Sequence, residues 1–204
     1  MVAGPVDAVI FDLGGVLIDW DPRYLYARIF PDRAEMETFL ATVLTAHWHA
    51  GNDAGIAMAD RAAELARAFP EHEAAIAAFD TRWDETFAGA FPETVALLER
   101  LDARGVPLYA ITNWPGDKFP RARARFEFLA RFRDIVVSGE ERIRKPDPAI
   151  FHLATARFGI DPARTLFIDD HEPNVIAARA LGFHVHHHAG ASGLAARLAG
   201  LDLI

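Results

Sequence analysis

Side chains suited to catalysis stand directly after three apolar runs of the sequence, at the points where β-strands would end. They are one aspartate, a threonine followed by an asparagine, and a pair of aspartates: Asp12, Thr112, Asn113, Asp169 and Asp170. Because ligands of open parallel sheets bind beyond the carboxyl ends of the strands, we expect these residues to meet at one edge. Three neighbouring carboxylates repel one another unless their pKa values rise or a cation lies among them.

A lysine belongs to the same group. Lys145 lies in the segment Arg144-Lys145-Pro146-Asp147-Pro148, just ahead of an expected helix start, and its ammonium is a compact point charge. Hard oxygen ligands, with a phosphate as a further ligand, favour Mg²⁺. A single aspartate after a strand more often caps a helix or forms a turn, so the chemical interpretation depends on all these residues converging.

The elements that must position these residues alternate along most of the chain. Five apolar runs predict buried strands: Val6–Phe11, Pro107–Thr112, Ile135–Ser138, Thr165–Ile168 and Phe183–His186. Three amphipathic segments begin with proline and end just before glycine, as helices do: Pro92–Arg104, Pro146–Phe158 and Pro173–Leu181. This alternation predicts the doubly wound α/β class, a parallel sheet with helices on both faces.

One long stretch breaks the alternation. From about Asp21 to Ala90 the apolar residues follow helical spacing only, including Ile76, Phe79, Trp83 and Phe87. We therefore expect an all-helical cap, residues 21–89, inserted into an α/β core made of residues 1–20 and 90–204.

The overall composition limits the partners. The 204 residues carry a formal net charge of −8, which disfavours nucleic acid and anionic membranes as partners. The chain has no cysteine, and Met1–Pro5 adds no basic residue ahead of the first apolar run. We expect a cytoplasmic protein without signal peptide or membrane anchor that acts on a small-molecule substrate. The sequence carries no indication of the oligomeric state.

The sequence resembles the haloacid dehalogenase-like hydrolase superfamily. Four segments carry the resemblance, in the order of that superfamily's motifs: Val9–Leu17, Ile111–Asn113, Arg144–Pro148 and Phe167–Asp170. The position of the helical stretch also matches the cap that this superfamily inserts after its first motif.

The resemblance implies a nucleophile and a metal site. Asp12 would form an aspartyl-phosphate or an aspartyl ester that water then hydrolyses. Mg²⁺ would be held by Asp12, the backbone carbonyl of Gly14 and Asp170, with Asp169 beside them. Asn174 would orient the acidic loop.

The resemblance also implies groups that bind the transferring phosphoryl group. The Thr112 hydroxyl and the Asn113 backbone amide would hold its oxygens, and Lys145 would neutralise both the nucleophile and the developing charge.

One position departs from the pattern of the superfamily's phosphatases. Gly14 stands where those phosphatases carry an aspartate that protonates the leaving oxygen and later activates water, an effect worth roughly 10² to 10⁴ in rate. A phosphatase could take the proton from the substrate, from a water molecule or from a cap histidine, His47 or His49. A metal-independent 2-haloacid dehalogenase needs no acid, and a third alternative is an inactive binding protein.

The acidic pair favours the first alternative, a Mg²⁺-dependent phosphatase of a small phosphomonoester. The dehalogenases of the superfamily lack this pair, whereas Asp169-Asp170 resembles the metal-holding pattern of its phosphatases. Gly14 combined with the pair also resembles a subgroup of sugar-phosphate phosphatases.

Aromatic and histidine residues offer further candidates. His47 and Trp48 would lie over the site and contact the substrate if the cap folds back as a lid, although packing within the cap explains Trp48 equally well. Trp114 could form a wall of the pocket. The cluster from His184 to His188 could hold zinc, but alternate strand residues lie about 6 to 7 Å apart, so we favour a polar strand end.

Overall fold

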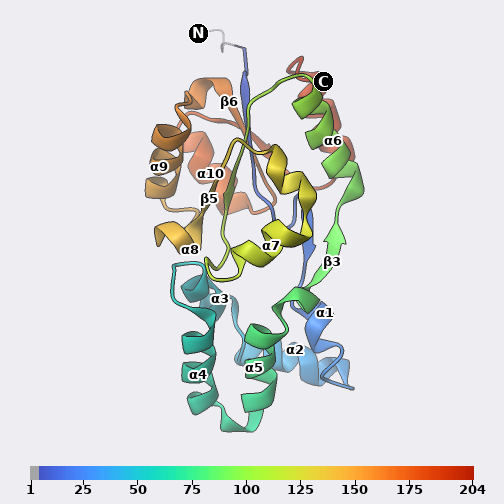
Figure 1. Ribbon diagram of the computed structural model, residues 1–204, viewed down its shortest axis with the longest axis vertical. Helices are drawn as coiled ribbons and strands as arrows, with labels where there is room; N and C mark the ends of the chain where they lie inside the picture. Colours follow the sequence, from blue (N-terminus) through green and yellow to red (C-terminus); the bar gives the residue numbers. More distant parts are fainter. Residues whose placement is uncertain (1–4) are drawn as a thin grey trace.

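The computed structural model describes residues 5–204, so Met1–Gly4, which belong to the N-terminal segment discussed above, lie outside the described residues. A five-stranded sheet, in the order β5-β4-β1-β6-β7, forms the centre of the larger part of the molecule (Figure 1). All neighbouring strands in it run parallel. Its strands are β1 (Ala8–Phe11), β4 (Leu108–Thr112), β5 (Asp134–Val137), β6 (Thr165–Asp169) and β7 (His184–His187).

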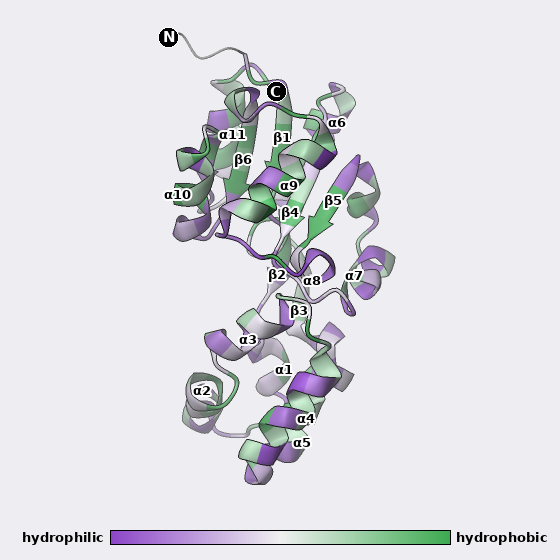
Figure 2. Ribbon diagram, turned by 90° about the vertical axis from the view of Figure 1, so that its left-hand side faces the viewer, coloured by the Kyte–Doolittle hydropathy of each residue, from purple (hydrophilic) through white to green (hydrophobic). Residues whose placement is uncertain are grey.

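The strands are buried because helices cover both faces of the sheet. Successive strand residues point to opposite faces, and accordingly Val9 and Phe11 of β1 belong to one apolar cluster while Ala8 and Ile10 belong to another. The first cluster includes residues of α6 (Pro92–Ala103) and α11 (Ala191–Ala199), and the second includes residues of α9 (Pro148–Phe158) and α10 (Glu172–Ala180). In Figure 2 the strands are mostly coloured as hydrophobic, whereas the helices beside them carry both hydrophilic and hydrophobic residues. The sequence-based α/β prediction is confirmed.

Short elements connect these layers in the same part of the chain. They are α7 (Phe119–Arg125), η3 (Glu127–Arg131), α8 (Ser138–Glu141) and η4 (Pro162–Arg164), where η denotes a 3-10 helix.

The segment after β1 forms a group of helices at the other end of the molecule (Figure 1). Its helices are α1 (Arg23–Tyr26), α2 (Arg33–Thr42), α3 (Ala46–Asn52), α4 (Met58–Ala68), η1 (Pro70–His72), α5 (Glu73–Thr81) and η2 (Trp83–Thr86). We call this group the helical segment. Its aromatic side chains pack on one another, with Phe79 in contact with Tyr26, Trp48 and Trp83.

Two short strands join the helical segment to the sheet. β2 (Ile18–Trp20) and β3 (Phe87–Ala90) pair antiparallel. The expectation of helix alone up to Ala90 is therefore wrong for the last four residues. Phe87 keeps helical spacing from Trp83, and a four-residue strand is too short to reveal an alternation. The proposed limits of the cap, residues 21–89, stay a prediction.

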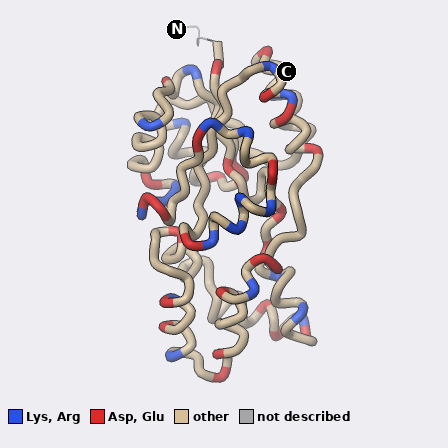
Figure 3. The backbone as a smooth tube through the Cα atoms, in the orientation of Figure 1, with Lys and Arg blue, Asp and Glu red and all other residues tan. Residues whose placement is uncertain are grey.

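Packing and charge hold the helical segment against the sheet domain. Trp114, in the loop after β4, contacts Trp83 and stacks on Phe87. Basic residues of the α7 region face acidic residues at the end of the helical segment (Figure 3): Lys118 pairs with Asp80, and Arg121 pairs with Asp84. Within residues 5–204, no helix has both the length and the apolar character needed to cross a bilayer.

Candidate active site

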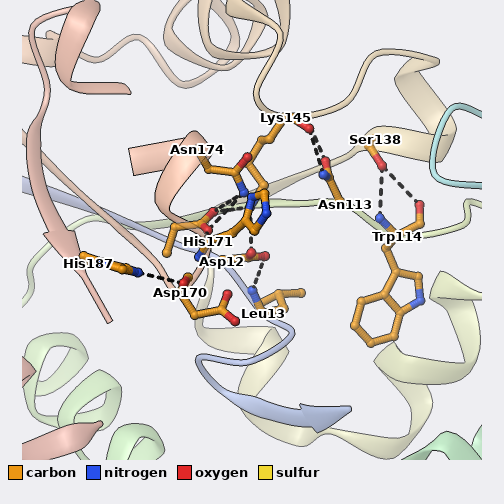
Figure 4. Close-up of polar contacts among 11 residues, drawn as sticks. Asp12, Leu13, Asn113, Trp114, Ser138, Lys145, Asp170, His171, Asn174 and His187 are labelled. Atoms are coloured by element: carbon orange, nitrogen blue, oxygen red, sulfur yellow. Dashed lines mark hydrogen bonds and ion pairs between the residues drawn. The ribbon is translucent and has the colours of Figure 1, made fainter. Parts of the chain in front are cut away.

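The site is built at the carboxyl edge of the sheet, where β1 lies between β4 and β6. Asp12 directly follows β1, and its backbone amide donates to the Ile168 carbonyl of β6 at 2.8 Å. The residue is buried, 8% exposed, and its Oδ1 accepts from the backbone amide of Leu13 at 2.7 Å. Backbone contacts thus fix the nucleophile proposed from the sequence on two sides, and Figure 4 shows the one with Leu13.

Lys145 joins two of the three carboxylates. Its Nζ lies 2.8 Å from Asp12 Oδ2 and 2.6 Å from Asp169 Oδ2, and the side chain is wholly buried. Burial alone would lower the pKa of Lys145, but the charges of Asp12 and Asp169 outweigh this effect and hold the pKa above its ordinary value. Lys145 therefore stays cationic beside Asp12.

Asn113 holds the backbone of Lys145. Its Oδ1 accepts from the Lys145 amide at 2.8 Å, and its Nδ2 donates to the Lys145 carbonyl at 3.0 Å. This pair of hydrogen bonds joins the loop after β4 to the segment before α9 (Figure 4). The sequence had suggested a role for the backbone amide of Asn113, whereas this side-chain role was not foreseen.

The two aspartates at the end of β6 lie in different environments: Asp169 is buried and Asp170 is exposed. Both oxygens of Asp169 accept from Asn174 Nδ2 at 3.0 Å, and Oδ1 also accepts from the His171 amide at 2.8 Å. Asp170 is exposed, and its backbone carbonyl contacts His187 Nε2 at 2.9 Å. Asp169 is held in place by the protein, and the carboxylate of Asp170 remains available for a ligand.

The three carboxylates fit a divalent cation. Asp12, Asp169 and Asp170 each offer an oxygen, and these oxygens lie within 4.8 Å of one another. When all three carboxylates are ionised, they carry three negative charges, of which the single positive charge of Lys145 balances one. Burial, together with the charges of Asp169 and Asp170, raises the pKa of Asp12 to about 8 against the opposing effect of Lys145. Burial and Asp169 likewise raise the pKa of Asp170. A bound cation would offset the repulsion between these carboxylates and so stabilise their ionised forms.

Thr112 carries a hydroxyl that the protein leaves without a partner. It ends β4 and is 1% exposed, and its Oγ1 is buried without a hydrogen bond. A buried hydroxyl normally has a partner, so an unpaired one at this edge of the sheet fits a bound oxygen ligand.

Comparison with known proteins identifies the family. The sequence model of the family of haloacid dehalogenase-like hydrolases matches residues 6–182 of the chain. The chain belongs to this family of hydrolases. It is therefore an enzyme, and the resemblance seen in the sequence is confirmed.

Several relatives of this haloacid dehalogenase-like hydrolase are phosphatases by name. A sesquiterpene phosphatase of Aspergillus oryzae is 29% identical over 177 residues, which are 86% of each chain. A phosphoglycolate phosphatase of Yersinia pseudotuberculosis is 28% identical over 186 residues, covering 87% of this chain and 78% of the relative.

Solved structures share the fold. A HAD family enzyme of Bacteroides thetaiotaomicron, in complex with magnesium and inorganic phosphate, has a TM-score of 0.65 at 24% identity, covering 89% of this chain and 93% of that one. The L-2-haloacid dehalogenase of Xanthobacter autotrophicus, with chloropropionic acid covalently bound, has a TM-score of 0.67 at 21% identity, covering 98% and 84%.

Two adjacent glycines in the first motif of this hydrolase differ in the space around them. Gly15 has a φ of +73°, and a Cβ there would overlap the carboxylate of Asp170. Its amide also donates to the Ile18 carbonyl of β2 at 3.0 Å. A Cβ on Gly14, in contrast, would have no atom within 4 Å. At position 15 only glycine leaves room for the carboxylate of Asp170. At position 14 there is space for a side chain, so steric hindrance does not explain why the aspartate of the phosphatases is absent there.

A cavity of about 240 Å³ lies between the core loops and the helical segment. Gly14, Asn113, Trp114 and Arg144 line it from the core. His49, Asn52, Asp53 and Trp83 line it from the helical segment, together with Trp20 of β2.

The structure does not bring His47 and Trp48 to this cavity. His47 is exposed, and Trp48 is buried against Phe79 within the helical segment. Neighbouring residues of α3 are turned by about 100° from one another, so the sequence could not decide which of them faces the core. His49 lines the cavity instead, as Trp114 does from the other side.

Unpaired polar atoms gather around this cavity. Both side-chain atoms of Asn52 are buried without a partner, and so is Nε of Arg144. Three indole Nε1 donors are also buried without a hydrogen-bond partner: those of Trp20, Trp83 and Trp114. Sequence reasoning missed four of the residues that line the cavity: Trp20, Asp53, Trp83 and Arg144.

The histidines of β7 make separate contacts. His184 Nε2 lies 3.0 Å from the Ala163 carbonyl, and His187 contacts the Asp170 carbonyl as described above. The rings of His186 and His188 lie with their centroids 6.0 Å apart. The contact of His187 gives this cluster a structural connection to the acidic loop.

The carboxylate cluster predicts stabilisation by Mg²⁺. At a free Mg²⁺ concentration about 100-fold above Kd, the unfolding midpoint of the wild type should rise by roughly 5 to 10 °C. Asp170→Asn should reduce this rise to under about 2 °C, because it removes the exposed ligand. Thermal unfolding with and without Mg²⁺ measures the effect. Asp60→Asn, an exposed change on α4, is the control, and an equal rise in wild type and Asp170→Asn would contradict the assignment.

The two glycines predict opposite results for the same substitution. Gly15→Ala should lower the free energy of unfolding by about 1 to 3 kcal/mol and abolish the Mg²⁺-induced rise, because its Cβ displaces Asp170. Gly14→Ala should keep the rise and change stability by less than about 1 kcal/mol. Denaturant unfolding and the thermal assay test both, and loss of the Mg²⁺ effect in Gly14→Ala would refute this distinction.

Proposed function

We propose that this hydrolase is a Mg²⁺-dependent phosphatase of small phosphomonoesters that uses Asp12 as its nucleophile. The observation that carries the proposal is the carboxylate cluster of Asp12, Asp169 and Asp170, whose charge exceeds what Lys145 balances. The phosphatase names of relatives at 28 and 29% identity support the same reaction class. Asp12, Asp170 and the Gly14 carbonyl would hold Mg²⁺, which supplies charge neutralisation for the phosphoryl oxygens when bound.

The chemistry of the chain begins with Asp12. Its carboxylate attacks phosphorus, the bond from phosphorus to the leaving oxygen breaks, and an aspartyl-phosphate forms that water then hydrolyses. Lys145, held at 2.8 Å from Asp12, offsets the charge on the phosphoryl group. The Thr112 hydroxyl and the backbone amide of Asn113 bind the oxygens of that group. Asn113 and Asn174 keep Lys145 and Asp169 in position through their side chains.

The alcohol part of the substrate would occupy the cavity next to Gly14. Its volume of about 240 Å³ is below the roughly 300 to 1,000 Å³ of typical pockets for drug-sized ligands, which favours a small leaving group. The unpaired donors of Asn52, Arg144 and the tryptophans favour a group rich in oxygen acceptors. A sugar phosphate meets both conditions. A cytoplasmic location, expected because the chain lacks cysteine, belongs to the same proposal.

Phosphate release from a panel of sugar phosphates and an aryl phosphate tests this function. The wild type should release phosphate with Mg²⁺ and stop when a chelator is added. Asp12→Asn should lose about 10⁴-fold or more in turnover, because the nucleophile is removed while the residue keeps its size. Phosphate release that is unaffected by Asp12→Asn would refute the nucleophile. Halide release from 2-haloacids in the presence of chelator would instead indicate a dehalogenase, and the absence of both turnover and Mg²⁺ binding would indicate a binding protein.

A further inference from the structure

A carboxyl group of the helical segment lines the same cavity as Gly14. Asp53 follows the last residue of α3 and lines the same cavity as Gly14, Asn113 and Arg144. It is partly buried, and within residues 5–204 its carboxylate makes no hydrogen bond or ion pair. A free carboxyl group therefore lines the cavity that also contains the position at which phosphatases of the superfamily carry their acid.

Close packing fixes this part of the helical segment on the core. The Asp53 amide donates to the His49 carbonyl at 3.2 Å, and the Gly55 amide donates to Asn52 at 3.2 Å, which forms a tight turn. Gly55 has a φ of +89°, and a Cβ there would lie 2.7 Å from the backbone oxygen of Gly139. Only glycine allows this approach. The turn that carries Asp53 thus rests directly on α8 of the core, the short helix that precedes the segment of Arg144.

The surroundings of Asp53 suit a group that exchanges a proton near neutral pH. Burial raises the pKa of Asp53 to about 6, and the facing charges of Arg144 and Lys145 limit the rise. His49 is the other titratable group of the helical segment on this cavity. Burial lowers its pKa to about 4, below that of Asp53, so at any pH His49 carries the proton needed for donation less often than Asp53 does.

We propose that Asp53 is the general acid and base of the reaction, in place of the aspartate that is absent at Gly14. The inference rests on the proposed phosphatase function. It assigns to the helical segment a catalytic residue as well as the walls of the substrate cavity.

The proton moves in two matched steps. As Asp12 bonds to phosphorus and the bond to the leaving oxygen breaks, the carboxyl proton of Asp53 passes to that oxygen, and the product leaves as a neutral alcohol. Asp53 is then a carboxylate. In the second step it accepts a proton from the water that attacks the aspartyl-phosphate, so that phosphate is released with Asp12 regenerated and Asp53 protonated again.

Leaving-group dependence tests this role. We would measure kcat/KM of wild type and Asp53→Asn on an alkyl phosphate, whose alkoxide needs a proton, and on p-nitrophenyl phosphate, whose phenolate leaves without one. Asp53→Asn should lose about 10²-fold or more on the alkyl phosphate and less than about tenfold on the aryl phosphate. Asp60→Asn, an exposed cap substitution, should lose neither activity, and thermal unfolding verifies that each variant is folded.

Two further measurements separate a catalytic from a structural role. With the alkyl phosphate, kcat of the wild type should fall as pH rises through the pKa of the acid, and Asp53→Asn should lack this fall. Adding Gly14→Asp to Asp53→Asn should restore turnover of the alkyl phosphate, since the space at Gly14 is free.

The outcomes distinguish this inference from the proposed function. Equal losses on both substrates, an unchanged rate on the alkyl phosphate, or a double variant no more active than Asp53→Asn would each overturn the role of Asp53 and leave the phosphatase intact. A wild type that hydrolyses neither phosphate would instead overturn the function itself.

Discussion

The buried ion pairs of Lys145 are the constraint on which the rest of the site depends. A wholly buried ammonium is tolerated because two carboxylates lie within 2.8 Å, and those carboxylates are tolerated because the ammonium stands between them. Each partner is in turn fixed by an amide side chain, Asn113 for the lysine segment and Asn174 for Asp169. Removing either side of this arrangement would leave an uncompensated buried charge, so these residues must be present together.

The arrangement explains why the sheet has its particular order. Asp12, Thr112 and Asp169 lie at the ends of three adjacent strands, and Lys145 reaches them from the segment before α9. Parallel strands bring all the carboxyl ends to one edge of the sheet, so residues that are far apart in sequence meet there. The apolar burial of the strands stabilises the sheet, and the polar groups at its edge are then held on a rigid base.

The sequence predicted this edge well and the helical segment poorly, for a physical reason. The end of an apolar run marks where a strand stops, so Asp12, Thr112 and Asp169 could be placed without coordinates. On α3, His47 and His49 lie about 200° apart around the helix axis, and which of them faces the core depends on how Trp48 packs against Phe79. The strand β3 was missed because Phe87 satisfies a helical spacing too. Asp53 gave no signal, since its proximity to Gly14 arises from the tertiary contact of Gly55 with Gly139.

The short distance along the chain between Asp12 and β2 has a mechanical consequence. Only the loop from Leu13 to Leu17 separates the two, and the Gly15 amide that bonds to Ile18 belongs to the same residue that must stay clear of Asp170. The helical segment is joined to the sheet domain by this loop and by Phe91, between β3 and α6, so any swing of the helices away from the sheet has to pivot on these two connections. With the proposed Mg²⁺ bound, opening the entrance for a substrate and weakening the binding of the cation would be coupled through this loop, and each would favour the other by the same free energy.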